Sequence, residues 1–80
     1  MSGTVTLKSL PDGKAGVVER VELKGATKRR LIEMGITPGT KITVLKRAPL
    51  GDPIEIMLRG YSLTIRGTDA DNIHVTEVGK

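Results

Sequence analysis

IEIMLRGYSLTIR, residues 54–66, is the stretch of sequence that decides the fold class. Isoleucine and leucine occupy every second position of its first half, and the alternation resumes after Gly60 with Tyr61, Leu63 and Ile65. A period of two is typical of a strand with one buried face, and a glycine between two such runs favours a tight turn. We expect a β-hairpin that turns at residues 59–61 and holds Tyr61 on its inward face.

Shorter runs of the same kind lie on both sides of this hairpin. Residues 41–47 alternate, with Ile42 and Val44 inward, and residues 73–76 give a last strand. Residues 4–10 and 16–23 are expected to be extended, the latter with Val17 and Val21 on one face, Val18 on the other, and Glu19 and Glu22 in solvent. Proline and glycine place turns at residues 10–13 and 37–40.

Residues 24–34 form the one convincing helix, because most of them are good helix formers. Gly35 is placed to adopt the left-handed conformation after the helix, and Ile36 can then contact Leu31 in a Schellman cap. A helix this short is not stable alone, so Leu31, Ile32 and Met34 are expected to pack on the sheet.

The chain has 80 residues, which is one domain, residues 1–80, with room for a single core. Five or so short strands joined by nearest-neighbour turns, with one short helix, predict a mainly β fold: a small, partly closed antiparallel barrel. Closure removes the exposed edges that short sheets otherwise offer.

Composition excludes several kinds of site. The chain has no cysteine, so it can hold no disulfide or thiolate metal site. Its one histidine, His74, is expected to be a solvated strand residue. With one histidine and three scattered serines no Ser-His-Asp arrangement can be argued, so an enzyme is not expected. Residues 69–72 resemble the start of a calcium loop, but the pattern then fails. No metal site or cofactor is therefore predicted within one chain.

Charge and apolar residues leave binding functions open. The 13 Lys+Arg against 9 Asp+Glu give a net charge of +4, and the cluster Lys28-Arg29-Arg30 could contact a nucleic-acid backbone. Nucleic acid is disfavoured as a partner: aromatic stacking platforms are absent apart from Tyr61, which argues against single-strand binding but leaves contact with a duplex backbone open. Two features favour protein recognition: an uncovered side of the helix, and residues 48–53, where Leu50 lies between two prolines. Whether Leu50 is exposed or folds back over the barrel stays open.

Four motifs carry a resemblance to a known family. RLIEMGITPGT (residues 30–40) is similar to the helix-and-turn signature of the FeoA family, accessory proteins of bacterial ferrous iron uptake. Residues 47–54 resemble its proline-flanked loop, residues 59–66 its central hairpin, and residues 10–16 its opening turn. The resemblance extends over nearly the whole chain.

The resemblance implies an SH3-like β-barrel with one short inserted helix, and a cytoplasmic protein that acts on FeoB, the membrane permease with a cytosolic G-protein domain. The related domain of iron-dependent repressors makes a metal-responsive role an alternative, as family-level transition metal binding suggests. Residues 1–4 lack the pattern of a signal peptide and no apolar run is long enough to span a membrane, so neither a leader nor a membrane span is expected. A weak homo-oligomer stays open. The residues expected to contact the partner lie on the helix and the loop, with two arginines at the rim: Arg30, Leu31, Met34, Arg47, Leu50, Gly51, Asp52 and Pro53.

Overall fold

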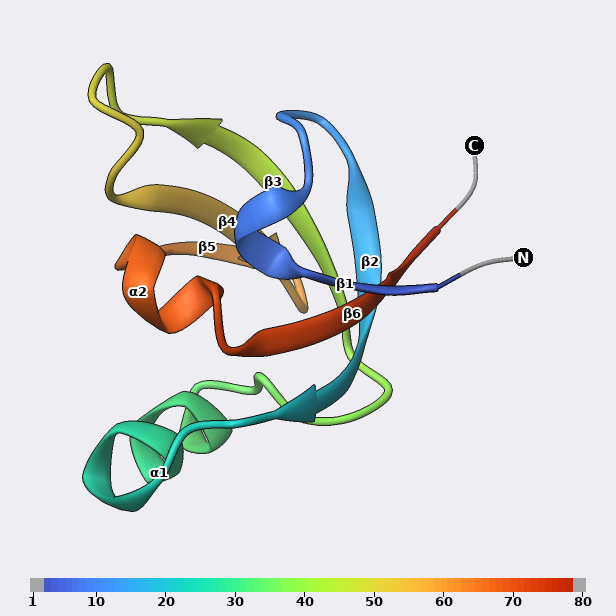
Figure 1. The fold of residues 1–80 in the computed structure, drawn as a ribbon, viewed down its shortest axis with the longest axis vertical. Coiled ribbons are helices and arrows are strands. Elements are labelled where there is room, and N and C mark those ends of the chain that lie inside the picture. The colour runs from blue at the N-terminus through green and yellow to red at the C-terminus, as the bar shows by residue number, and fades with distance from the viewer. Residues whose placement is uncertain (1–2, 79–80) are drawn as a thin grey trace.

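The computed structural model describes residues 3–78 as one curved antiparallel sheet with two short helices (Figure 1). In chain order the elements are β1 (Thr4–Thr6), a 3-10 helix η1 (Leu7–Ser9), β2 (Ala15–Val21), α1 (Gly25–Glu33), β3 (Lys41–Arg47), β4 (Ile54–Leu58), β5 (Tyr61–Ile65), α2 (Gly67–Ala70) and β6 (Ile73–Glu77). The mainly β class, the helix at residues 24–34 and the final strand are confirmed. Within the described residues, neither α1 nor α2 is long and apolar enough to cross a membrane.

The six strands follow the order β1-β6-β2-β3-β4-β5, and every neighbouring pair is antiparallel. The predicted hairpin is present as β4 and β5, which pair from Ile54 with Ile65 to Leu58 with Tyr61. Its turn contains only Arg59 and Gly60, with φ of 51° and 83°. Positive φ at both central residues is the type I′ geometry that follows the twist of a hairpin.

Two sequence-based expectations near the N-terminus are corrected. The first extended stretch ends at Thr6, because residues 7–9 turn into η1 and bury Leu7. In β2, Val18 and Val21 are both buried, although strict alternation placed them on opposite faces. The register of β2 against β6 shifts between Val18 and Arg20, and the extra residue of this bulge brings both valines to the core side.

The core is aliphatic and lies inside the curved sheet. Every strand except β1 contributes, together with η1, α1 and α2, and the fully buried side chains include Leu7, Leu10, Val18, Leu31, Ile36, Ile42, Val44, Ile54, Ile56, Leu58, Ile73 and Val75. Ile42 and Val44 are inward as predicted. The helix does not pack as a block: Leu31 is buried, whereas Ile32 is 41% exposed and lies on the outer side of α1.

The end of α1 is built as the sequence predicts. Ile36 N–H donates to the Leu31 carbonyl and Gly35 N–H to the Ile32 carbonyl, both at 3.0 Å, which are the two bonds of a Schellman cap. Gly35 has φ of 102° and no L-residue adopts that value without strain. Thr40 N–H then closes the next turn on the Thr37 carbonyl at 3.0 Å, with Gly39 at φ of 92°. These two turns send the chain from the helix directly into β3.

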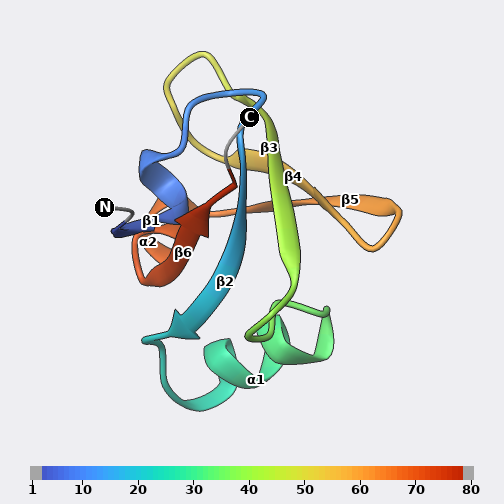
Figure 2. The same cartoon turned by 90° about the vertical axis from the view of Figure 1, so that its right-hand side faces the viewer.

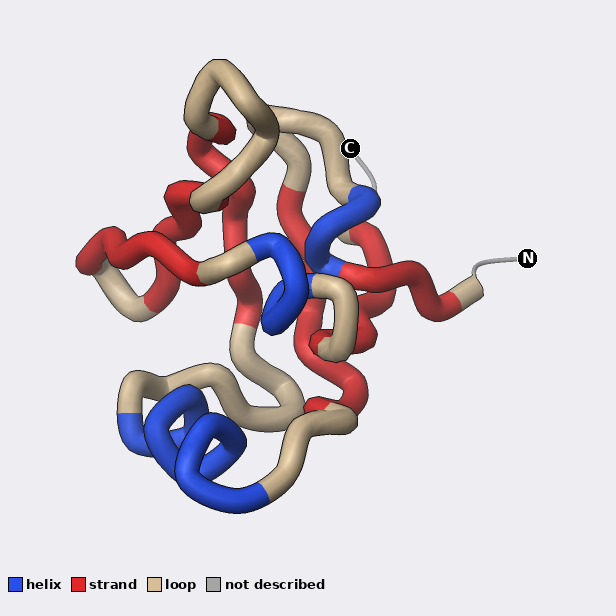
Figure 3. The backbone as a smooth tube through the Cα atoms, turned by 60° about the vertical axis from the view of Figure 1, so that its left-hand side comes forward, coloured by secondary structure: helices blue, strands red, loops and turns tan. Residues whose placement is uncertain are grey.

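The sheet coils round the core but does not close. β1 and β5 are its two edges and are not paired with each other, so the expected removal of edges by closure is not achieved. Figure 2 shows α1 below one end of the sheet, with the β4–β5 hairpin extending beyond it to one side. Figure 3 shows the same hairpin and α1 on one side of the molecule. This open side holds the candidate site.

Candidate functional site

The hairpin turn is fastened to the end of α1. Tyr61 Oη donates to the carbonyl oxygen of Met34, and Arg59 Nη2 donates to Thr40 Oγ1 at 3.2 Å. Tyr61 is 42% exposed, so its predicted place on the inward face is corrected: it lies at the rim and reaches the helix with its hydroxyl. The first contact ties the start of β5 to the end of α1, and the second ties the hairpin turn to the residue before β3.

Between α1 and β5 lies a groove of about 330 Å³, which we call the β5 groove. It is lined by Arg30, Met34, Pro53, Leu63, Thr64, Ile65 and Arg66. Four of these side chains are apolar and two are arginines, and no carboxylate lines the groove. The groove therefore suits an apolar group that carries or adjoins a negative charge.

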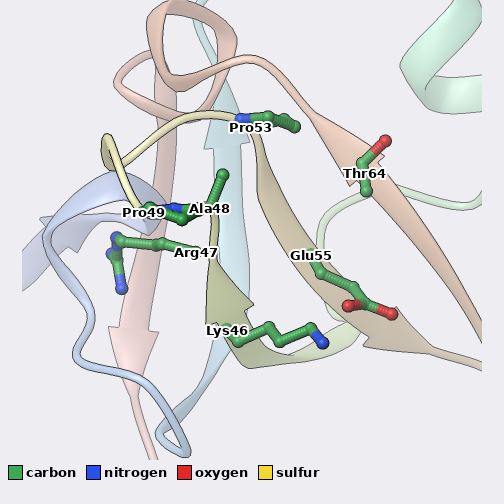
Figure 4. Close-up of a pocket in the computed structure, with 7 residues that line it drawn as sticks. All are labelled: Lys46, Arg47, Ala48, Pro49, Pro53, Glu55 and Thr64. Atoms are coloured by element: carbon green, nitrogen blue, oxygen red, sulfur yellow. The ribbon is translucent and has the colours of Figure 1, made fainter.

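A second hollow, the proline hollow, has a volume of about 260 Å³ and adjoins the first (Figure 4). It is lined by Lys46, Arg47, Ala48, Pro49, Pro53, Glu55 and Thr64. Figure 4 shows the prolines on one side and the side chains of Lys46 and Glu55 running along the sheet below them. Because Pro53 and Thr64 line both hollows, the two form one concave strip along the end of β5.

The loop at residues 48–53 projects at the end of the molecule opposite α1 (Figure 1). Leu50 at its tip is 96% exposed, so of the two alternatives for this residue the structure has the exposed one. A hydrogen bond from Gly51 N–H to the Ala48 carbonyl at 2.7 Å closes the tip, and Asp52 accepts a hydrogen bond from Gly67 N–H at its base. The loop thus presents a large apolar side chain on a tied backbone.

Seven of the eight sequence-predicted contact residues separate into three groups. Arg30, Met34 and Pro53 come together in the β5 groove. Leu50, Gly51 and Asp52 are exposed on the loop. Leu31 is fully buried, so the expectation that it contacts a partner is corrected: it has no surface to offer.

Arg47 is committed to contacts inside the chain. Its Nη1 donates to Asp12 Oδ1 at 2.6 Å, and its Nη2 donates to the carbonyls of Lys8 and Leu10 at 2.5 and 2.6 Å. The guanidinium therefore holds the turn before β2 against the end of β3, besides lining the proline hollow.

Sequence reasoning missed the contribution of β5. Leu63, Thr64 and Ile65 line the β5 groove together with Arg66, which follows the strand. The alternation of residues 61–66 predicts a strand, but it does not say that the strand is an edge. Only the order of the six strands makes β5 an edge, and only the tertiary structure places it beside α1.

His74 is half-buried, not solvated as expected. Its side chain is 19% exposed and its Nε2 lies 2.9 Å from Glu22 Oε1, while Arg20 Nε donates to Glu22 Oε2 at 2.8 Å. The Arg20 guanidinium, and secondly the bond with His74, lower the pKa of the Glu22 carboxyl below 4.5. Among residues 3–78, no group of three or more His, Asp or Glu side chains is arranged to hold a metal ion.

Comparison with known proteins identifies the family of this chain. The FeoA domain matches residues 5–77, and 69 residues are 39% identical to an Fe(2+) transport protein A/Fe(2+) transporter FeoB fusion protein of Porphyromonas gingivalis. The chain belongs to the FeoA family. That family functions in ferrous iron transport. The matched segment is 86% of this chain but only 8% of the fusion protein, whose remainder has no counterpart here.

Solved structures of the family share the fold. FeoA from Chlorobium tepidum superimposes with a TM-score of 0.89 at 39% identity, covering 94% of this chain and 71% of that one. FeoA from Stenotrophomonas maltophilia, an SH3 domain protein solved in complex with zinc, gives 0.76 at 28% identity, covering 89% of this chain and 88% of that one. The predicted SH3-like barrel is confirmed. A manganese-dependent transcriptional repressor, at 20% identity and a TM-score of 0.85, shares the fold alone; the match covers 98% of this chain and 44% of that one.

Proposed function

We propose that this protein is a non-enzymatic, cytoplasmic accessory factor of ferrous iron uptake that acts by direct contact with the cytosolic G-protein domain of the permease FeoB. The observation that carries the proposal is the fused relative, in which an Fe(2+) transport protein A and the transporter FeoB are one polypeptide. Two proteins joined in one chain are held at a high effective concentration, which favours a functional contact between them.

Two exposed apolar features support a contact surface. Leu50 stands almost entirely in solvent, and Met34 lies half-buried in the β5 groove. An apolar side chain held on a tied loop loses little entropy when a partner covers it. Arg30 beside Met34 supplies charge that sets the association rate and its salt dependence.

The test is a calorimetric titration of the purified FeoB cytosolic domain with this protein. Leu50→Ala and Met34→Asp should each weaken binding by about tenfold, the value of losing one well-packed anchor of about 1.4 kcal/mol. Met57→Ala and Ile32→Asp are matched controls, because Met57 and Ile32 are exposed apolar residues outside both hollows. Folded Leu50 and Met34 variants that bind as tightly as the controls would show that the contact lies elsewhere.

A further inference from the structure

The free edge of β5 carries backbone groups that the sheet does not use. Leu58 and Tyr61 flank the two-residue turn and form a hydrogen-bonded pair, so by alternation Leu63 and Ile65 also direct their N–H and C=O groups toward β4. Ser62 and Thr64 must then direct theirs outward. Among residues 3–78 no backbone hydrogen bond outside the ladder reaches either residue. The edge therefore offers two donors and two acceptors in the spacing of a strand.

This edge opens onto the concave strip described above. Thr64 lines both hollows, and Leu63 and Ile65 line the β5 groove on the core side of the strand. A strand added beside β5 would point alternate side chains to the two faces of the sheet. Side chains on the inner face would reach Met34 and Leu63. Those on the outer face would lie on the side of Thr64 and Arg66, where Arg66 and Arg30 at the rim of the groove can meet a carboxylate.

Charge indicates which segment fits. Arg30 on α1 and Arg66 after β5 both line the groove, and no carboxylate does. Two carboxylates lie close by: Asp52 accepts a hydrogen bond from Gly67 N–H, and Glu55, opposite Thr64 on β4, lines the proline hollow together with Lys46 and Arg47. A second copy of this chain is a poor occupant, because pairing two β5 edges would bring the arginines of both copies to one seam.

We propose that the β5 edge receives an extended acidic segment of a partner protein by strand addition, with alternate apolar side chains in the β5 groove and carboxylates at Arg30 and Arg66. Main-chain pairing supplies affinity in this mode, and the pockets for alternate side chains supply selectivity. The proposal rests on the proposed function only in that the occupant belongs to a protein partner. It specifies the chemistry of the bound segment and the backbone atoms that it contacts.

The first experiment titrates the ¹⁵N-labelled full chain with a capped hexapeptide of alternating valine and aspartate. The peptide should shift the amide signals of residues 61–66 and slow hydrogen exchange at Ser62 and Thr64, whose amides are unpaired in the free protein. The same peptide with lysine in place of aspartate should bind at least about fivefold more weakly at low salt. Protection of other amides instead, no response to millimolar peptide, or equal binding of the lysine peptide overturns the proposal.

Variants separate the backbone contact from the charges. Thr64→Pro removes only an outward N–H, and proline is tolerated on an edge strand, so the variant should keep the ladder to β4 and lose peptide binding. Arg30→Glu and Arg66→Glu keep every backbone group and should each weaken binding about fivefold or more at low salt. Arg29→Glu is the matched control, because Arg29 is exposed on the same helix outside the groove. If Thr64→Pro does not fold, the Arg30→Glu and Arg66→Glu variants test the proposal instead, and unchanged peptide binding by both overturns it.

The outcomes for this proposal and for the FeoB contact are distinct. Unchanged binding of the FeoB domain by a folded Thr64→Pro variant overturns strand addition while the FeoB contact stands. Peptide protection of Ser62 and Thr64, with no binding of the FeoB domain to the wild type, supports strand addition and removes FeoB as the partner.

Discussion

Arg47 provides the sharpest test of how contacts inside the chain compete with contacts to a partner. We predict that Arg47→Met destabilises the fold, because the guanidinium joins β3 to three groups of residues 8–12. Each bond to a backbone carbonyl, at 2.5 and 2.6 Å, contributes about 1 kcal/mol net. The pair with Asp12 adds at most about 1 kcal/mol, since the Asp12 side chain is 54% exposed.

The expected loss for Arg47→Met is thus about 2–3 kcal/mol of the free energy of unfolding. A domain of this size has about 4–12 kcal/mol in total, so the loss is a large fraction of it. Thermal unfolding should shift down by about 10–20 °C. Arg47→Lys keeps the charge but cannot form the fork of three bonds, so we expect an intermediate loss.

Guanidinium chloride unfolding followed by circular dichroism measures these values, with the slope m checked for constancy. Lys46→Met is the matched control, because Lys46 is the exposed neighbour on the same strand. The reasoning is refuted if Arg47→Met unfolds within about 0.5 kcal/mol of that control. A variant of unchanged stability that binds the FeoB domain more weakly would instead establish Arg47 as a rim contact, as the sequence suggests.

Two further predictions concern β2 and its neighbour β6. A Cβ on Gly16 would lie 2.7 Å from Val75 Cγ2 and 2.9 Å from Val75 Cβ. Gly16→Ala should therefore destabilise the fold by about 1–3 kcal/mol, reduced by the about 0.4–1 kcal/mol that alanine gains by restricting the unfolded chain. Thermal unfolding should show a smaller loss of stability in a Val75→Ala background, and a Gly16→Ala variant of unchanged stability would contradict the contact. Because Arg20 lowers the pKa of Glu22 below 4.5, the stabilisation by Glu22 is complete above pH 4.5 and lost as pH falls through the lowered value. Unfolding midpoints of wild type and Glu22→Gln should therefore differ at pH 7 and converge in acid, whereas a constant difference would remove this role.

Much of the fold could be predicted because local rules agree with the tertiary structure. The alternation of residues 54–66 and Gly60 specify the hairpin, and Gly35 with Ile36 specifies the helix end. Both depend only on neighbours in sequence. The faces of Val18 and Val21 could not be predicted, because a bulge depends on the strand opposite and not on β2 itself.

The candidate site could be predicted only in part for the same reason. Leu50 and Met34 are large apolar residues beside turn residues, and this local pattern suggests exposure. The burial of Leu31 depends on which side of α1 meets the core, and the place of β5 as an edge depends on the order of all six strands. His74 differs from expectation because its carboxylate partner, Glu22, lies 52 residues away in sequence.

An open strand edge is usually a hazard, because it can pair with any other unpaired strand. β1 limits that hazard by being only three residues long, but β5 has five residues and no bulge against β4. The two arginines beside β5 offer a different protection, since they repel a second copy of the same edge while they attract a carboxylate. Replacing both arginines with glutamate should therefore have two effects with one cause. The β5 edge should no longer bind the acidic segment, and it should no longer repel cationic segments. A double variant that still selects the acidic peptide would show that the backbone edge, and not its charge, governs recognition.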